Sequence, residues 1–219
     1  IDNSDTALNE LKARIMDMEK ECHEVADKLS TSRKDVCGAL ENRMISTLQQ
    51  LGMADAKFIV EITKTEEFTP LGTDSVAYMF TANPTTKPAS VERVASGGEL
   101  SRIMLSLKAM LAERKKLPTV IFDEIDTGVS GSVADKMGSM ICGMGDFMQV
   151  FAITHLPQVA AKGKAHYLVS KDIDPEVSKA VSKIEKLSDE QRVLEVARML
   201  SGSVLTDAAI ANAKSLLQD

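Results

Sequence analysis

The first part of the chain carries apolar residues at alternating intervals of three and four positions. The repeat comprises Leu8, Leu11, Ile15, Met18, Cys22, Val25 and Leu29. This spacing is typical of the a and d positions of a coiled coil, and about three heptads need a partner strand to be stable. The alternative is an amphipathic helix lying on a globular core, but the apolar stripe is narrow, which favours the coiled coil. We therefore predict the end of a coiled-coil arm over residues 1–30.

After the polar residues 30–32, the pattern predicts a second helix and then a pair of half-exposed strands. The helix has its apolar positions at Val36, Leu40, Met44, Leu48 and Leu51, and it should end at Gly52, a residue favoured at helix ends. Apolar and polar residues alternate over 58–62 and again over 76–80, with an expected turn at 72–74. This alternation predicts a hairpin.

The second half of the chain predicts a parallel sheet. Residues 119–122 and 150–153 are continuous apolar runs, which are typical of strands buried on both faces. Residues 132–144 would form the crossover helix between them. Further along we expect a short helix from Pro157, a strand at 167–169, an alternating segment ending near Leu187, and helices at 188–200 and 206–217. The predicted fold is an α/β lobe over 31–219 that follows the arm.

Composition narrows the classes of function. Of the 219 residues, 44% are hydrophobic, which is ample for an ordered core. The formal net charge of -6 does not suggest a surface devoted to nucleic acid, so most of any such surface would lie elsewhere. Three cysteines without paired spacing suit a reducing cytoplasm, and the sequence has no transmembrane run or signal peptide. The start at Ile1 leads us to expect a piece of a longer protein.

Two adjacent carboxylates follow the first apolar run. Asp123 and Glu124 would lie at the carboxyl edge of a parallel sheet, where open α/β sheets bind ligands. One carboxylate can hold Mg²⁺, directly or through water, while the other positions and polarises an attacking water. Two solvated acids after a core strand are the alternative interpretation of this spacing.

A second cluster begins a helix, and a histidine follows the second apolar run. Ser96 and Glu99 have the spacing of a capping box, which is a purely structural device. Gly97 and Gly98, however, leave bare amides at a helix N-terminus, where an anion such as phosphate is favoured. His155 could bind or sense a phosphate oxygen at the same sheet edge, although a lone histidine is more often structural.

The order of these elements resembles the C-terminal part of an ABC-type ATPase head, with a mostly parallel sheet. In that resemblance, residues 96–101 are the signature motif, 120–123 the Walker B strand and 125–128 the D-loop. Glu124 corresponds to the catalytic carboxylate and His155 to the switch histidine. The preceding coiled coil, and Glu at position 99 where transporters commonly have Gln, favour the SMC/Rad50-like branch.

The resemblance implies an ATPase that acts in DNA double-strand-break repair and recombination, in the cytoplasm and on the nucleoid. Two heads would form a homodimer around ATP and Mg²⁺, and DNA would be a partner of the full-length protein. The resemblance implies that Ser96, Gly97 and Gly98, beside Glu99, contact the phosphate across the dimer. It implies that Asp123 supports Mg²⁺ and that Glu124 activates the attacking water. His155 would stabilise the γ-phosphate, and Asp126 would couple the two sites.

The sequence departs from the family pattern in one respect. No G-x-x-x-x-G-K-[ST] loop is present, and within the resemblance that loop belongs to the N-terminal half of the same head. We therefore expect this chain alone neither to bind ATP tightly nor to hydrolyse it. Three other interpretations stay open: another SMC/Rad50-like head, a transporter ATPase subunit, and a non-catalytic coiled-coil module with vestigial motifs. A transporter subunit would lack the coiled coil and would need a membrane partner. The presence of both Glu124 and His155 argues against the non-catalytic module.

Overall fold

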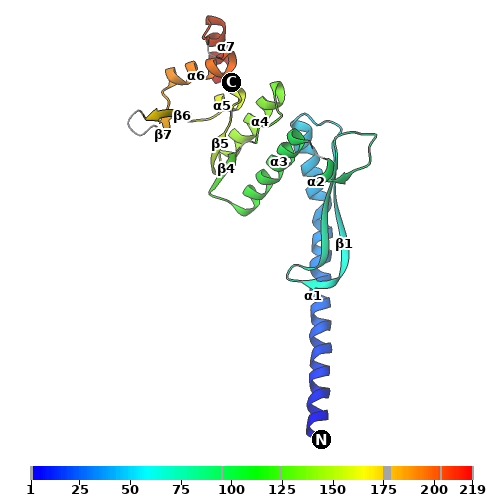
Figure 1. Cartoon of the computed structure of the whole chain (residues 1–219). Coiled ribbons are helices and arrows are strands. Elements are labelled where there is room, and N and C mark those ends of the chain that lie inside the picture. Colours follow the sequence, from blue (N-terminus) through cyan, green and yellow to red (C-terminus); the bar gives the residue numbers. More distant parts are fainter. Residues whose placement is uncertain (1, 95, 124, 175–178, 203, 219) are drawn as a thin grey trace. The chain divides into compact units, whose positions relative to one another are not determined.

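The computed structural model describes residues 2–94, 96–123, 125–174, 179–202 and 204–218. The chain divides into two compact units, Ile1–Gln49 with Ala54–Ala95, and Gln50–Met53 with Ser96–Asp219. Figure 1 labels the helices and strands along the chain. Across the described residues, none of the helices is both long and apolar enough to cross a membrane. The division into a coiled-coil arm, 1–30, and a lobe, 31–219, stays a prediction.

The first unit is built on one long helix, α1 (Asp2–Gln50). The sequence predicted two helices that meet at residues 30–32, and this was wrong. Ser and Thr disfavour a helix only mildly, and the Thr31 hydroxyl donates to the Asp27 carbonyl at 2.9 Å, one turn earlier in the same helix. Ser30 is 3% exposed, so tertiary packing also holds this turn.

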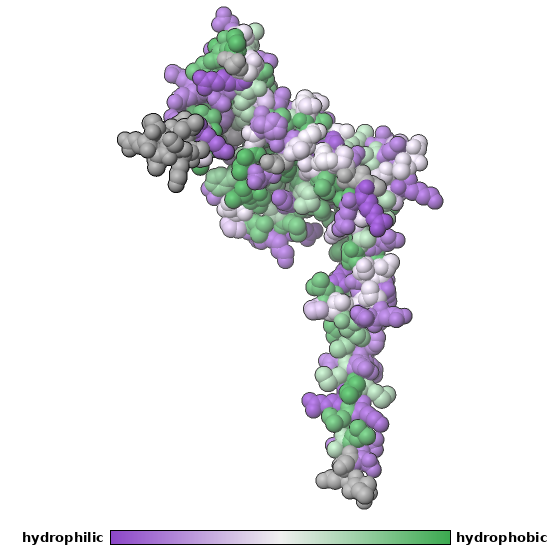
Figure 2. Space-filling view, in the orientation of Figure 1, coloured by the Kyte–Doolittle hydropathy of each residue, from purple (hydrophilic) through white to green (hydrophobic). Residues whose placement is uncertain are grey.

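The apolar residues of the expected coiled-coil seam lie on the surface of α1. Leu11, Ile15 and Met18 are each more than half exposed, at 57%, 55% and 57%. Figure 2 shows hydrophobic side chains in green along this end of the helix. The seam is therefore available to a partner strand, whose presence stays a prediction.

A long antiparallel hairpin, β1 (Lys57–Thr69) and β2 (Gly72–Thr81), completes most of this unit. Phe58 lies opposite Phe80, and both are 1% exposed, which confirms the predicted alternation. The turn, however, is formed by residues 70–71, and Gly72 already begins β2 with a φ of +91°. The expected turn at 72–74 was wrong because Pro70 and a single glycine suffice to reverse the chain. A short strand, β3 (Ala89–Ser90), and α2 (Val91–Val94) follow.

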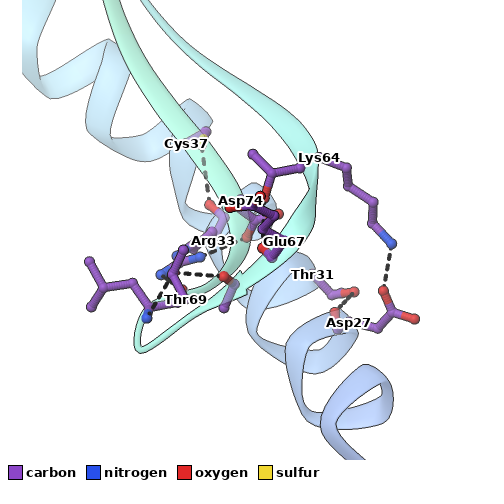
Figure 3. A network of polar contacts seen from close by, with 11 residues as sticks. Asp27, Thr31, Arg33, Cys37, Lys64, Glu67, Thr69 and Asp74 are labelled. Atoms are coloured by element: carbon purple, nitrogen blue, oxygen red, sulfur yellow. Dashed lines mark hydrogen bonds and ion pairs between the residues drawn. The ribbon is translucent and has the colours of Figure 1, made fainter. Parts of the chain in front are cut away.

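Polar contacts hold the hairpin against α1 (Figure 3). The Arg33 guanidinium donates to the Asp74 carboxylate and to the Leu71 carbonyl, each at 2.7 Å. The hydrogen bond from Arg33 is the largest cause of a lowered pKa at Asp74, and the Ser30 hydroxyl adds to it. Because the Asp74 side chain is 1% exposed, this ion pair fixes the hairpin at one height along the helix.

The second unit contains the predicted βαβ arrangement. Helix α3 (Gly97–Lys115) precedes β4 (Thr119–Asp123), and α4 (Gly131–Met144) connects β4 to β5 (Gln149–Ile153). The strands β4 and β5 are parallel, in register from Thr119 opposite Gln149 to Asp123 opposite Ile153. The core of this unit gathers side chains from both helices and the sheet: Leu51, Leu105, Ala112, Phe122, Ile125, Val129, Ala134, Met137, Ile141, Met144, Met148 and Val159.

Among the residues that the structure describes, one face of this parallel pair is covered and the other is exposed, so the expectation that both strands are buried on both faces was wrong. Phe122 is fully buried, whereas Ile121, Phe151 and Ile153 are 60%, 45% and 56% exposed. The described residues of the second unit supply a helical layer for the first face alone. The apolar runs therefore indicate that both faces of these strands are apolar, and one of these faces is accessible to solvent in this structure.

The remainder of the second unit follows the sequence expectation with one extension. Helix α5 (Pro157–Ala161) leads to β6 (Tyr167–Asp174), which pairs antiparallel with β7 (Lys179–Lys186). The strand predicted at 167–169 is longer because backbone pairing with β7 continues into the polar stretch. Helices α6 (Asp189–Ser201) and α7 (Asp207–Gln218) confirm the two predicted terminal helices.

Candidate active site

The predicted signature turn is a complete capping box at the start of α3. The Ser96 backbone N–H donates to the Glu99 carboxylate at 2.7 Å, and the Glu99 N–H donates to Ser96 Oγ at 3.4 Å. The structural alternative raised by the sequence is thus present. It does not occupy the amides of Gly97 and Gly98, because the first N–H groups of a helix have no partner within it.

The two glycines of this turn differ in their surroundings. A Cβ on Gly97 would meet nothing within 4 Å, whereas a Cβ on Gly98 would lie 2.8 Å from the Gly128 carbonyl oxygen. Gly128 has a φ of +72°, a conformation that L side chains rarely adopt. The backbone of the signature turn therefore lies directly against the predicted D-loop.

Arg102 is a residue whose role the sequence did not reveal. Its Nε donates to the Gly98 carbonyl at 3.0 Å, and its Nη1 donates to the Leu51 carbonyl at 3.2 Å. Arg102 lies four residues after Gly98 and therefore on the same side of α3. This spacing is the feature of the sequence that could have predicted the contact. The side chain ties the signature turn to the segment that follows α1.

The residues after β4 and β5 meet at a buried carboxylate. Asp126 is 1% exposed, and its Oδ2 accepts hydrogen bonds from the Thr154 hydroxyl and from the His155 backbone N–H, the latter at 3.2 Å. His155 Nδ1 lies 3.5 Å from the same oxygen, while the His155 side chain is 75% exposed. The structure thus brings Asp126 and His155 together and leaves the imidazole open to solvent.

The two carboxylates predicted to carry the chemistry are seen to different extents. Asp123 ends β4 with an exposed side chain, and Glu124 lies outside the described residues. Within the described ranges, no hydrogen bond or ion pair joins Ser96 or Glu99 to Asp123 or His155. These site assignments stay predictions.

An Mg²⁺ site at Asp123 is compatible with the structure. No group of three or more His, Cys, Asp or Glu side chains that could hold a metal occurs among the residues that are described. Mg²⁺ at nucleotide sites is usually bound by one or two carboxylates together with the substrate phosphates, so a closed protein cage is not required. A single exposed carboxylate at a strand end fits that mode.

Comparison with known proteins relates the chain to DNA repair proteins. It is 42% identical over 209 residues to the DNA repair protein RecN of Rickettsia conorii, and 35% identical over 218 residues to that of Vibrio cholerae. These matches cover 95% and 99% of this chain but only 38% and 39% of the relatives, so the chain spans about two fifths of their length. No protein-family model matches.

Solved structures of SMC heads share the fold. The Smc head domain of Pyrococcus yayanosii, with a coiled coil and joint, matches with a TM-score of 0.63 at 16% identity, over 90% of this chain and 36% of that one. A structure from work on ATP-driven dimerization and DNA-stimulated activation of SMC ATPases matches with a TM-score of 0.53 at 16% identity, over 76% of this chain and 94% of that one. The predicted fold class is confirmed. In sequence the chain is similar to RecN proteins over nearly its whole length, and it shares the fold of solved SMC heads.

Proposed function

We propose that this chain is the part of an SMC-like DNA repair ATPase that supplies the hydrolytic carboxylate, the switch histidine and the signature motif. The matched relatives are named DNA repair proteins, and one structural neighbour concerns ATP-driven dimerization of SMC ATPases. The observation that carries the proposal is the parallel pair β4–β5, because Asp123 and the Asp126–His155 contact lie just at its carboxyl ends.

The proposed roles of Asp123 and His155 suit the exposure of their side chains. The exposed Asp123 would support Mg²⁺, and Glu124, the next residue, would take a proton from the attacking water. The exposed imidazole of His155 would donate to a γ-phosphate oxygen. ATP with its Mg²⁺ provides the phosphoryl group and part of the charge neutralisation.

The signature turn would act on the ATP of a second head. Ser96 and Gly97 are exposed, and the amides of Gly97 and Gly98 are not used within α3. A phosphate approaching from outside the chain would find these groups together with the positive end of a helix of 19 residues. The exposure of these groups supports the proposal that two heads form a homodimer that closes on ATP.

The exposed face of β4–β5 is the surface that the N-terminal half of the same head would cover. Ile121, Phe151 and Ile153 are apolar side chains on a sheet of a kind that is usually covered on both faces. The same half would carry the phosphate-binding loop. In the full-length protein, DNA would be the further partner, and recombinational repair on the nucleoid in the cytoplasm the setting.

The proposal is tested by ATP turnover of the full-length protein, with and without DNA, in the wild type and in Glu124→Gln. Loss of a general base typically lowers a rate by about 10²–10⁴-fold, so Glu124→Gln should lose turnover while it still binds ATP and accumulates as a dimer. Glu10→Gln, an exposed carboxylate on α1, is the matched control and should turn over normally. Unchanged turnover in Glu124→Gln would refute the role of Glu124 as the base, whereas a wild type without turnover would favour a non-catalytic module that acts through the exposed seam of α1.

A further inference from the structure

The residue before His155 makes two hydrogen bonds of opposite sense. The Thr154 hydroxyl donates to Asp126 Oδ2 and accepts from the backbone N–H of Leu156 at 3.0 Å. A hydroxyl has one proton to donate, so these partners fix its orientation. Thr154 therefore joins the buried carboxylate to the backbone on the far side of His155.

The Asp126 carboxylate, at the centre of this arrangement, makes its contacts with the segment that carries Thr154 and His155. Asp126 is 1% exposed, and a buried charge needs partners to offset its desolvation. Its Oδ2 receives the Thr154 hydroxyl and the His155 N–H, and lies 3.5 Å from His155 Nδ1. Asp126 thus contacts the segment after β5 in its own chain, and its side chain is withdrawn from the surface.

The imidazole of His155 has little else to place it. Its side chain is 75% exposed, so packing does not set its direction. The backbone on each side is held instead, by Asp126 at the His155 amide and by Thr154 at the Leu156 amide, just before the buried Pro157 begins α5. The position of the ring thus depends on these two backbone contacts and on the approach of its Nδ1 to Asp126 Oδ2 at 3.5 Å.

We propose that Thr154 is a positioning residue, which together with Asp126 clamps the backbone at His155 and keeps the imidazole directed outward. The inference rests on the proposed function, because it takes the phosphate contact of His155 as given. It assigns Asp126 a role within its own head, which differs from the direct coupling across a dimer that the sequence resemblance implied.

The test uses the full-length protein with Thr154→Val, which removes the hydroxyl, and Thr154→Ser, which restores it. Misplacement of a catalytic group by about 1 Å can cost about 10²-fold in rate, so we expect a smaller shift to cost about tenfold. Thr154→Val should therefore lower kcat by about tenfold or more while KM for ATP and ATP binding stay unchanged, and Thr154→Ser should recover most of the loss. A merely structural role would lower the melting temperature and leave kcat unchanged.

A double-mutant cycle with His155→Ala decides whether Thr154 acts through the ring. If it does, Thr154→Val lowers turnover in the wild type but adds little in the His155→Ala background. An equal fold-loss in both backgrounds, or normal turnover of Thr154→Val, overturns the inference. Thr154→Ala takes its place in the same cycle if the valine variant does not fold. A wild type without turnover, or a fully active His155→Ala, refutes instead the proposed function on which the inference rests.

Discussion

Replacing Gly98 by alanine tests how closely the signature turn and the D-loop approach. The added Cβ would lie 2.8 Å from the Gly128 carbonyl oxygen, whereas ordinary contacts begin near 3.4 Å. The two backbone segments must therefore separate by about 0.6 Å, and neither is a flexible side chain. Gly97→Ala is the matched control, because it adds the same methyl one residue earlier with nothing within 4 Å.

The two substitutions should change the free energy of unfolding in opposite directions. Overpacking costs about 1–3 kcal/mol and alanine recovers about 1 kcal/mol of helix propensity, so Gly98→Ala should lower the free energy of unfolding by up to about 2 kcal/mol. Gly97→Ala should gain about 0.4–1 kcal/mol, since its conformation suits alanine. For a chain of this size, 1 kcal/mol corresponds to about 2–4 °C in melting temperature.

The assay is thermal unfolding of the chain, followed by circular dichroism at a helical wavelength. Gly98→Ala should melt at least about 1 °C below Gly97→Ala. In the full-length protein, Gly98→Ala should also lower ATP turnover, because the displaced segment carries Asp126. Equal melting temperatures for the two variants, or a more stable Gly98→Ala, would refute the close approach of Gly98 and Gly128.

Two further predictions concern pH and the open sheet face. Burial lowers the pKa of His166 below its usual 6.5, with the Arg192 cation as a further cause. The unfolded chain then binds the proton more readily, so stability should fall as the pH drops below about 6.5, and His166→Gln should reduce this dependence in melts at pH values of about 7.5 and 5.5. Ile121→Lys should change the stability of this chain by no more than about 0.5 kcal/mol, because the side chain is 60% exposed. If the N-terminal half covers this face, the same substitution should markedly destabilise the full-length protein. Equal effects in both proteins would argue against that packing.

Local patterns predicted the elements of this chain better than their extents. The apolar runs at 119–122 and 150–153 identified a parallel βαβ unit, because such runs have few other uses in a folded lobe. The polar residues 30–32 suggested a break in the first helix, but Ser30 is buried, the Thr31 hydroxyl bonds within the helix, and the helix continues to Gln50. Burial of both sheet faces could not be read from the runs, since their pattern shows that a face is apolar and not what covers it.

In the candidate site, too, the sequence predicted the local contacts and not those between distant residues. The sequence identified Ser96 and Glu99 as a capping box, because both partners lie within four residues of each other. The contact of Gly98 with Gly128 and the bonds from Thr154 and His155 to Asp126 join residues about 30 positions apart. No local spacing encodes such contacts, so motif matching named Asp126 and His155 without showing that they meet.

Burial separates the motif residues into two groups that the sequence treats alike. Asp123 and His155 are exposed and can reach a ligand, whereas Asp126 is withdrawn beneath the segment that carries His155. Gly98 is likewise constrained by a neighbouring backbone and not only by a phosphate. Loss of turnover on changing Gly98 or Asp126 would therefore not identify a contact with ATP, because displacing Thr154 and His155 gives the same result. Only a comparison in the His155→Ala background separates a residue that touches the phosphate from one that holds the imidazole in place.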